Sequence, residues 1–96
     1  TEDGFLASVK EKGERIRQAV LSWESPRIRG VRGKGLMLGL ELEGVAPKAA
    51  VAALLERGLV ALTAGEDVLR LLPPLTITDG ELERGLAILA AWAREV

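Results

Sequence analysis

Apolar and charged residues alternate with a helical period at the start of the chain. The apolar positions are spaced by three or four residues, which places them on one face of an amphipathic helix. The members of this stripe are Leu6, Val9, Gly13, Ile16, Val20 and Trp23. Charged residues fill the opposite face, and Ser25-Pro26 is a dipeptide that ends helices. The pattern predicts a helix over residues 4–23.

The period changes to two in residues 27–43, which is the spacing of a β-strand. One face carries Leu36, Leu38, Leu40 and Leu42, and the other carries Met37, Gly39, Glu41 and Glu43. A shorter and less regular strand, Arg27 to Arg32, comes before it. Gly33-Lys34-Gly35 lies between the two strands and predicts a hairpin turn, because glycine adopts positive φ at little cost.

Two more helices are predicted further along the chain. Pro47 suits the first turn of a helix, and Gly58 suits the position just after one. The buried stripe of this helix is expected to be Ala50, Val51, Leu54 and Leu55. Thr78 followed by Glu81 forms a capping box at the start of the last helix. Its stripe is Leu82, Leu86, Leu89 and Ala93, widened by Ile88 and Trp92.

A second hairpin lies between these helices. Short strands are predicted from Leu59 to Leu62 and from Val68 to Leu72, with a turn over residues 64–67. Pro73-Pro74 ends the second strand, because neither residue can donate an N–H to a sheet. The element order is α-β-β-α-β-β-α. It predicts a single α+β domain over residues 1–96, with a small, mainly antiparallel sheet covered by helices.

Composition narrows the chemistry that this domain can perform. The chain has 96 residues, 48% of them hydrophobic, and a net charge of -1. It contains no Cys and no His, which excludes a disulfide frame, a His general base and a Cys/His zinc site. The near-neutral charge argues against a dedicated nucleic-acid binder, and no apolar run approaches the roughly 20 residues of a membrane helix. We expect a fragment that contributes to a site, and Thr1 is expected to begin an excised or processed segment.

The run Gly30-Val-Arg-Gly-Lys-Gly35 superficially suggests phosphate binding. A P-loop needs a longer spacing and a Ser or Thr after the Lys, with a helix to follow. A KH-type Gly-x-x-Gly loop does not lie between strands. Hairpin geometry is therefore the favoured interpretation of these glycines.

Charged side chains on the strands have both structural and functional interpretations. Four basic residues could contact nucleic acid or a phosphorylated partner, but no aromatic residue is interleaved for base stacking. They are Arg27, Arg29, Arg32 and Lys34. Charges on an edge strand also prevent aggregation, and this role is favoured, although the same arginines could face a missing domain. Glu41 and Glu43 could do acid–base work, but alternation on a solvated strand face explains them more simply.

Arg70 is the charged residue of greatest interest, because every neighbour in Val68-Leu-Arg-Leu-Leu72 is aliphatic. A guanidinium is costly to bury without an anion. One interpretation is an internal ion pair with Glu41 or Glu43, or exposure at a sheet edge. The other is a bidentate clamp for a carboxylate ligand, whose geometry the Arg fork matches. Spacing alone leaves these two interpretations equal.

Several segments resemble the C-terminal small domain of class III aminotransferases. Val31-Arg-Gly-Lys-Gly-Leu-Met-Leu-Gly-Leu-Glu-Leu42 is similar to the hairpin that opens that domain. Glu56-Arg-Gly-Leu-Val60, Ala64-Gly65 and Val68-Leu-Arg-Leu-Leu-Pro-Pro-Leu75 are similar to its later part. Asp3-Gly-Phe-Leu6 and Lys12-Gly-Glu14 extend the resemblance to the first helix, and it is greatest to the acetylornithine aminotransferase group.

This resemblance implies a pyridoxal-phosphate (PLP) enzyme of fold type I, a cytoplasmic homodimer. It would exchange an amino group between N-acetylornithine, or a related ω-amino acid, and 2-oxoglutarate, in arginine or lysine biosynthesis. The resemblance assigns Arg70 to the α-carboxylate of the substrate. The family's large domain carries the Schiff-base Lys and the phosphate site, and none of Lys10, Lys12, Lys34 and Lys48 matches that Lys. The chain alone is expected to bind no PLP and to be inactive.

Two other classes of function remain as alternatives. A stand-alone α/β binding or regulatory module would need a start codon directly upstream of Thr1, whereas a preceding reading frame of roughly 300 residues would favour the enzyme fragment. A nucleic-acid module that uses the hairpin between Arg27 and Lys34 would bind with steep salt dependence. No membrane partner is expected.

Overall fold

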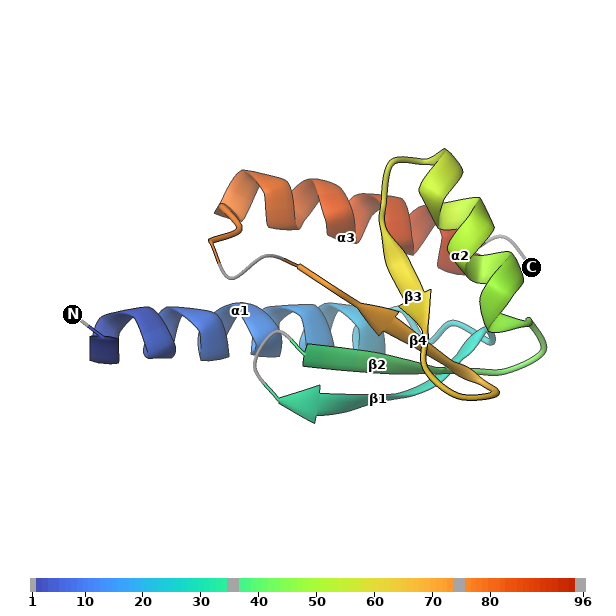
Figure 1. Ribbon diagram of the computed structural model, residues 1–96, viewed down its shortest axis with the longest axis horizontal. Coiled ribbons are helices and arrows are strands. Elements are labelled where there is room, and N and C mark those ends of the chain that lie inside the picture. The colour runs from blue at the N-terminus through green and yellow to red at the C-terminus, as the bar shows by residue number, and fades with distance from the viewer. Residues whose placement is uncertain (1, 35–36, 74–75, 95–96) are drawn as a thin grey trace.

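The computed structural model describes residues 2–34, 37–73 and 76–94. Within these residues three helices and four strands follow one another in the predicted order, which confirms the α+β fold (Figure 1). None of the described helices is long and apolar enough to cross a membrane. The elements are α1 Glu2–Ser22, β1 Ile28–Lys34, β2 Met37–Leu42, α2 Pro47–Glu56, β3 Ala61–Thr63, β4 Val68–Leu71 and α3 Asp79–Arg94.

The four strands form one antiparallel sheet in the order β1-β2-β4-β3. β1 is an edge strand, as predicted, and β4 lies inside the sheet between β2 and β3. A bulge between Ile28 and Gly30 shifts the register of β1 against β2. Because the bulge adds one residue, Ile28 and Val31 both pack against the core although they are three positions apart.

The first hairpin turn is placed differently from its prediction. β1 continues through Lys34, which pairs with Met37, so the prediction of a turn at Gly33 and Lys34 is wrong. Gly33 has a φ of 110°, and a Cβ there would lie 1.9 Å from the Met37 carbonyl oxygen, so the glycine serves a close backbone approach inside the hairpin. Gly35 and Leu36 lie outside the described residues.

The strand predicted over residues 59–62 begins later, at Ala61, because Leu59 still takes part in the C-terminal cap of α2. The Leu59 N–H donates to the Leu54 carbonyl at 2.9 Å, and the Gly58 N–H donates to the Leu55 carbonyl at 3.0 Å. With Gly58 at a φ of 90°, these bonds form a Schellman motif. The predicted role of Gly58 is confirmed.

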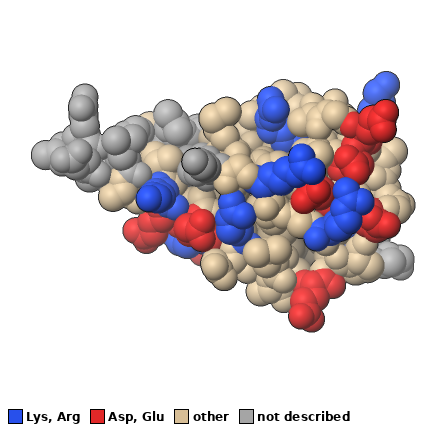
Figure 2. All heavy atoms as spheres, turned by 90° about the horizontal axis from the view of Figure 1, so that it is seen from below, with Lys and Arg blue, Asp and Glu red and all other residues tan. Residues whose placement is uncertain are grey.

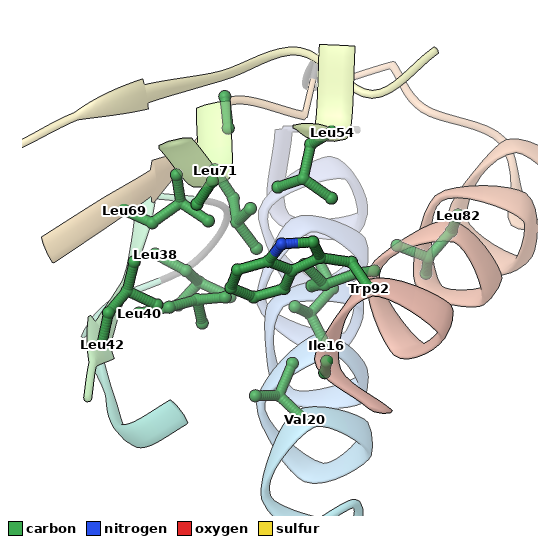
Figure 3. Packing of buried hydrophobic residues seen from close by; sticks show 14 of the residues in the cluster. Ile16, Val20, Leu38, Leu40, Leu42, Leu54, Leu69, Leu71, Leu82 and Trp92 are labelled. Carbon is green, nitrogen blue, oxygen red and sulfur yellow. The ribbon is translucent and has the colours of Figure 1, made fainter. Parts of the chain in front are cut away.

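The core lies between one face of the sheet and the three helices. The indole of Trp92 sits at its centre, among leucines of β2 and β4 and the apolar stripe of α1 (Figure 3). Leu55, predicted to be buried, is 60% exposed, because α2 buries only the narrower stripe of Pro47, Ala50 and Leu54. The side chain of Leu6 lies outside what the structure describes.

The ends of α3 are fixed by side chains from several segments. Thr78 and Glu81 exchange hydrogen bonds between backbone N–H and side-chain oxygen, at 3.0 and 3.2 Å, which confirms the predicted capping box. At the other end, Ser25 and Arg27 donate to the carbonyls of Ala93 and Trp92. These bonds satisfy carbonyl groups that a helix end otherwise leaves without partners.

Candidate functional site

The face of the sheet opposite the helices is open. Strand alternation directs Gly39 and Glu41 of β2 and Arg70 of β4 to this face, because Leu38, Leu40, Leu69 and Leu71 are buried on the other. Across the strands, Arg32 pairs with Gly39, Gly39 with Arg70, and Leu62 with Arg70. One row of residues across the open face, from β1 to β3, therefore consists of Arg32, Gly39, Arg70 and Leu62.

Arg70 is exposed although its neighbours in the sequence are aliphatic. Those neighbours alternate: Leu69 and Leu71 point into the core while the guanidinium points away from it. Arg70 is also not at a sheet edge, since β4 has a strand on each side. Among the described residues, no ion pair or hydrogen bond engages its side chain, which leaves five N–H donors available to an external anion.

The predicted ion pair between Arg70 and Glu41 or Glu43 is not formed in the described structure, because other arginines hold both carboxylates. Arg32 donates to Glu41 at 2.9 Å, and Arg29 donates to Glu43 at 3.0 Å. Arg29 also donates to Asp67 at 2.8 Å, and this bond, with a smaller contribution from Glu43, raises the pKa of Arg29 above its usual value. Both carboxylates thus form ion pairs, which the interpretation of a merely solvated strand face did not include, and Glu43 lies just after the end of β2.

The basic cluster is largely engaged with protein groups. Arg27 stacks on the Trp92 ring at 5.1 Å, and Arg29 and Arg32 are bound to carboxylates. The face seen in Figure 2, below β1 and β2 in Figure 1, accordingly shows acidic and basic side chains side by side. Such a mixed surface does not form the continuous positive stripe that nucleic acid requires. The Lys34 side chain lies outside the described residues.

Two glycines of the glycine-rich run lie in the sheet, and three of the lysines lie on helices. Gly30 and Gly33 of the glycine-rich run pair with Glu41 and Leu38 inside the sheet, so they form no loop that could cradle a phosphate. Lys10 and Lys48 are exposed, and Lys12 donates its ammonium hydrogen to the carbonyl of Ile77. No group of three or more Asp and Glu among the described residues is arranged to hold a metal ion.

An apolar hollow of about 320 Å³ lies between α1, α3 and the end of β4. Its lining is aliphatic apart from Glu81, which the capping box already uses. The hollow offers packing surface without a reacting group, so Arg70 on the open face remains the candidate for ligand binding.

The sequence did not indicate the importance of two glycines. Gly39 places no side chain of its own between Arg32 and Arg70, and a Cβ there would lie 3.0 Å from Val68 Cγ1. Gly30 lies directly across from Glu41. A Cβ on Gly30 would stand 2.8 Å from Glu41 Oε1. The signal was the presence of glycine inside a strand, which often marks a close approach. The partners of both glycines depended on strand pairings that the sequence did not specify.

Comparison with known proteins finds a matching family and relatives that cover most of this chain. A family model described as aminotransferase class-III matches residues 1–92. The mitochondrial acetylornithine aminotransferase of Alnus glutinosa is 44% identical over 89 residues, which cover 90% of this chain and 20% of that protein. The acetylornithine aminotransferase of Mesorhizobium japonicum is 42% identical over 96 residues, covering 97% of this chain and 24% of the relative.

Solved structures of such enzymes share the fold. The acetylornithine aminotransferase of Elizabethkingia anophelis superposes with a TM-score of 0.87 at 25% identity, covering 99% of this chain and 26% of that one. The enzyme from Stenotrophomonas maltophilia gives 0.82 at 36% identity, covering 92% and 26%. The chain thus spans about a quarter or less of the length of these relatives.

Proposed function

This chain belongs to the class III aminotransferase family, and on that premise we propose that it is the C-terminal small domain of a longer, PLP-dependent transaminase. The matched relatives are named acetylornithine aminotransferases. We assign the longer protein the transfer of an amino group between N-acetylornithine, or a related ω-amino acid, and 2-oxoglutarate. Since none of Lys10, Lys12, Lys34 and Lys48 matches the Schiff-base Lys of the family, we assign the cofactor to parts of that protein outside this chain.

The contribution of this domain is to bind and orient a carboxylate through Arg70. The observation that carries this assignment is an exposed guanidinium that has no anion among the described residues and lies between Gly39 and Leu62 on the open face. Gly39 has no side chain to cover the guanidinium, and Leu62 places an apolar side chain on its other flank. A planar carboxylate can accept two parallel hydrogen bonds from such a guanidinium.

Orientation by Arg70 would act on both substrates. The amino donor and 2-oxoglutarate each present an α-carboxylate, so one clamp can fix the position of either molecule. Fixing the substrate reduces the entropy that must be lost on reaching the transition state. Further expectations for the longer protein are a homodimer in the cytoplasm that serves arginine or lysine biosynthesis, while this chain alone is inactive.

The test is substitution of Arg70 in the full-length enzyme. Arg70→Lys keeps the charge but cannot make two parallel hydrogen bonds, so it should not preserve activity. We expect kcat/KM to fall about 30-fold to several thousand-fold for both substrates, as for loss of a charge-assisted pair. Cofactor absorbance should be unchanged. Steady-state kinetics of both half-reactions and an absorbance spectrum supply the measurements.

Arg15→Lys is the matched control. Arg15 also binds carboxylates, those of Asp79 and Glu83, but on the helical side of the domain. This variant should retain normal kinetics. If Arg70→Lys instead lowers the folded fraction while the folded enzyme keeps its kcat/KM, Arg70 has a structural role and the assignment is wrong.

A further inference from the structure

We propose that Arg32 is a positioning residue that holds Glu41 away from Arg70 and thereby keeps Arg70 available to an external carboxylate. This inference rests on the proposed function of Arg70. Glu41 lies on the same sheet face as Arg70 but does not pair with it. The contacts of Glu41 with β1 explain why.

Glu41 is close enough to Arg70 to compete for it. Glu41 and Gly39 belong to the same face of β2, and Gly39 is the direct cross-strand partner of Arg70. Glu41 and Arg70 are therefore diagonal neighbours on adjacent strands. Diagonal neighbours are about 7–8 Å apart at the backbone, within reach of two long side chains. An ion pair between them is the ordinary expectation for this arrangement.

The structure shows Glu41 leaning the other way, toward the edge strand β1. Arg32 Nη2 lies 2.9 Å from Glu41 Oε2, and Arg29 Nη2 lies 3.7 Å from the same oxygen. Glu41 Oε1 lies over Gly30, where a Cβ would come within 2.8 Å of it. The absence of a side chain at Gly30 therefore makes room for the carboxylate, whose side chain is only 22% exposed.

Arg29 cannot replace Arg32 fully in this role. Its guanidinium is already bound to Glu43 at 3.0 Å and to Asp67 at 2.8 Å, and its contact with Glu41 is the longest of the three. Loss of the Arg32 guanidinium would leave Glu41 with one distant, shared cation. The carboxylate could then turn toward β4, past the Val68 side chain, and pair with Arg70. An internal anion at Arg70 would compete with the substrate.

The experiment uses three variants of the full-length enzyme: Arg32→Leu, Glu41→Gln and the double variant. We expect Arg32→Leu to raise KM for 2-oxoglutarate about two- to fivefold, the range set by an exposed competing ion pair, with little change in kcat. Glu41→Gln should leave KM near the wild-type value. The double variant should recover the wild-type KM, because a neutral amide cannot compete as an anion.

A charge-matched control separates this role from a general change in electrostatic potential. Arg32→Leu combined with Glu66→Gln restores the same net charge, but Glu66 lies in the turn between β3 and β4. This combination should keep the raised KM. Equal recovery with Glu66→Gln would overturn the proposal, and so would an unchanged KM in Arg32→Leu. Arg15→Leu, on the helical side, controls for loss of an Arg–carboxylate contact.

The Arg70 variants distinguish failure of the carboxylate clamp at Arg70 from failure of the positioning role of Arg32. If Arg70→Lys has normal kinetics, the carboxylate clamp itself is wrong. If Arg70→Lys is impaired but Arg32→Leu is not, the clamp stands and the positioning role of Arg32 is wrong. Circular dichroism of every variant shows whether the fold is retained, so that kinetic changes are compared only among folded proteins.

Discussion

At the scale of single residues, Arg70 and Trp92 show how strand and helix geometry decides what a side chain does. Arg70 stands among leucines in the sequence yet is exposed, because alternate residues of β4 point to opposite faces. Trp92, predicted only to widen a stripe, fills the centre of the core. It is 2% exposed and lies among buried side chains of α1, α2, β2 and β4 in Figure 3.

Truncating Trp92 should therefore be far more costly than truncating the other tryptophan. Trp92→Ala removes a fully buried aromatic side chain, for which the expected loss is about 3–5 kcal/mol of unfolding free energy. Trp23 is half-buried at the end of α1, so Trp23→Ala should lose clearly less. Urea denaturation of the chain, followed by circular dichroism, measures both. Equal losses would contradict the central position of Trp92.

At the scale of elements, hydrophobic periodicity located all seven helices and strands that the structure describes, with predicted ends shifted by at most two residues. Caps were predictable where a local motif fixes them, as at Thr78 and at Gly58. The strand order was not predictable, because pairing of β2 with β4 joins residues about 30 positions apart. Such pairings depend on packing rather than local sequence.

The surroundings of Arg70 also depend on strand pairings that local sequence does not specify. Arg70 was identified from its unusual neighbours and from the family resemblance. Its relation to Gly39 and Arg32 exists only once β4 lies beside β2 and β2 beside β1. A bulge in β1 further determines where Gly30 and Arg32 fall, and a one-residue change of register would reverse their faces. The sequence therefore identified Arg70 but not the residues that surround it in the sheet.

The capping box of α3 predicts a dependence of stability on pH. Hydrogen bonds from the Thr78 backbone N–H and hydroxyl lower the pKa of Glu81 below its usual value of 4.5. A carboxyl whose pKa is lower in the folded state stabilises the fold above the unfolded-state pKa, and this contribution is lost as the pH falls through the folded-state pKa. Ionised Glu81 should therefore stabilise the chain at neutral pH and cease to do so in acid.

Glu81→Gln isolates this contribution, because Gln fits a capping box but carries no charge. The melting temperature of the variant should be lower than that of the wild type at pH 7. The difference should shrink as the pH falls below about 4.5. Glu66→Gln, in the exposed turn between β3 and β4, controls for the loss of one charge. A difference that grows in acid would contradict the sign of the Glu81 pKa shift.

At the scale of the whole molecule, the sheet is covered by helices on one face only. The open face combines the ion pairs of Arg29 and Arg32 with exposed apolar side chains. Met37 on β2 is 76% exposed, and Leu62 on β3 is 49% exposed. The relatives are four to five times longer than this chain, so a longer protein has ample polypeptide to cover this face.

Without such a cover, the 96-residue chain should self-associate through the open face, because exposed apolar side chains on an uncovered sheet face favour contact between copies. Sedimentation velocity at rising concentration should show a sedimentation coefficient that increases with concentration. Met37→Lys with Leu62→Lys should abolish this increase, since charges on an open sheet face oppose pairing. Leu55→Lys, which changes an equally exposed leucine on α2, should not. A monomer at every concentration, or equal suppression by Leu55→Lys, would show that the open face does not drive association.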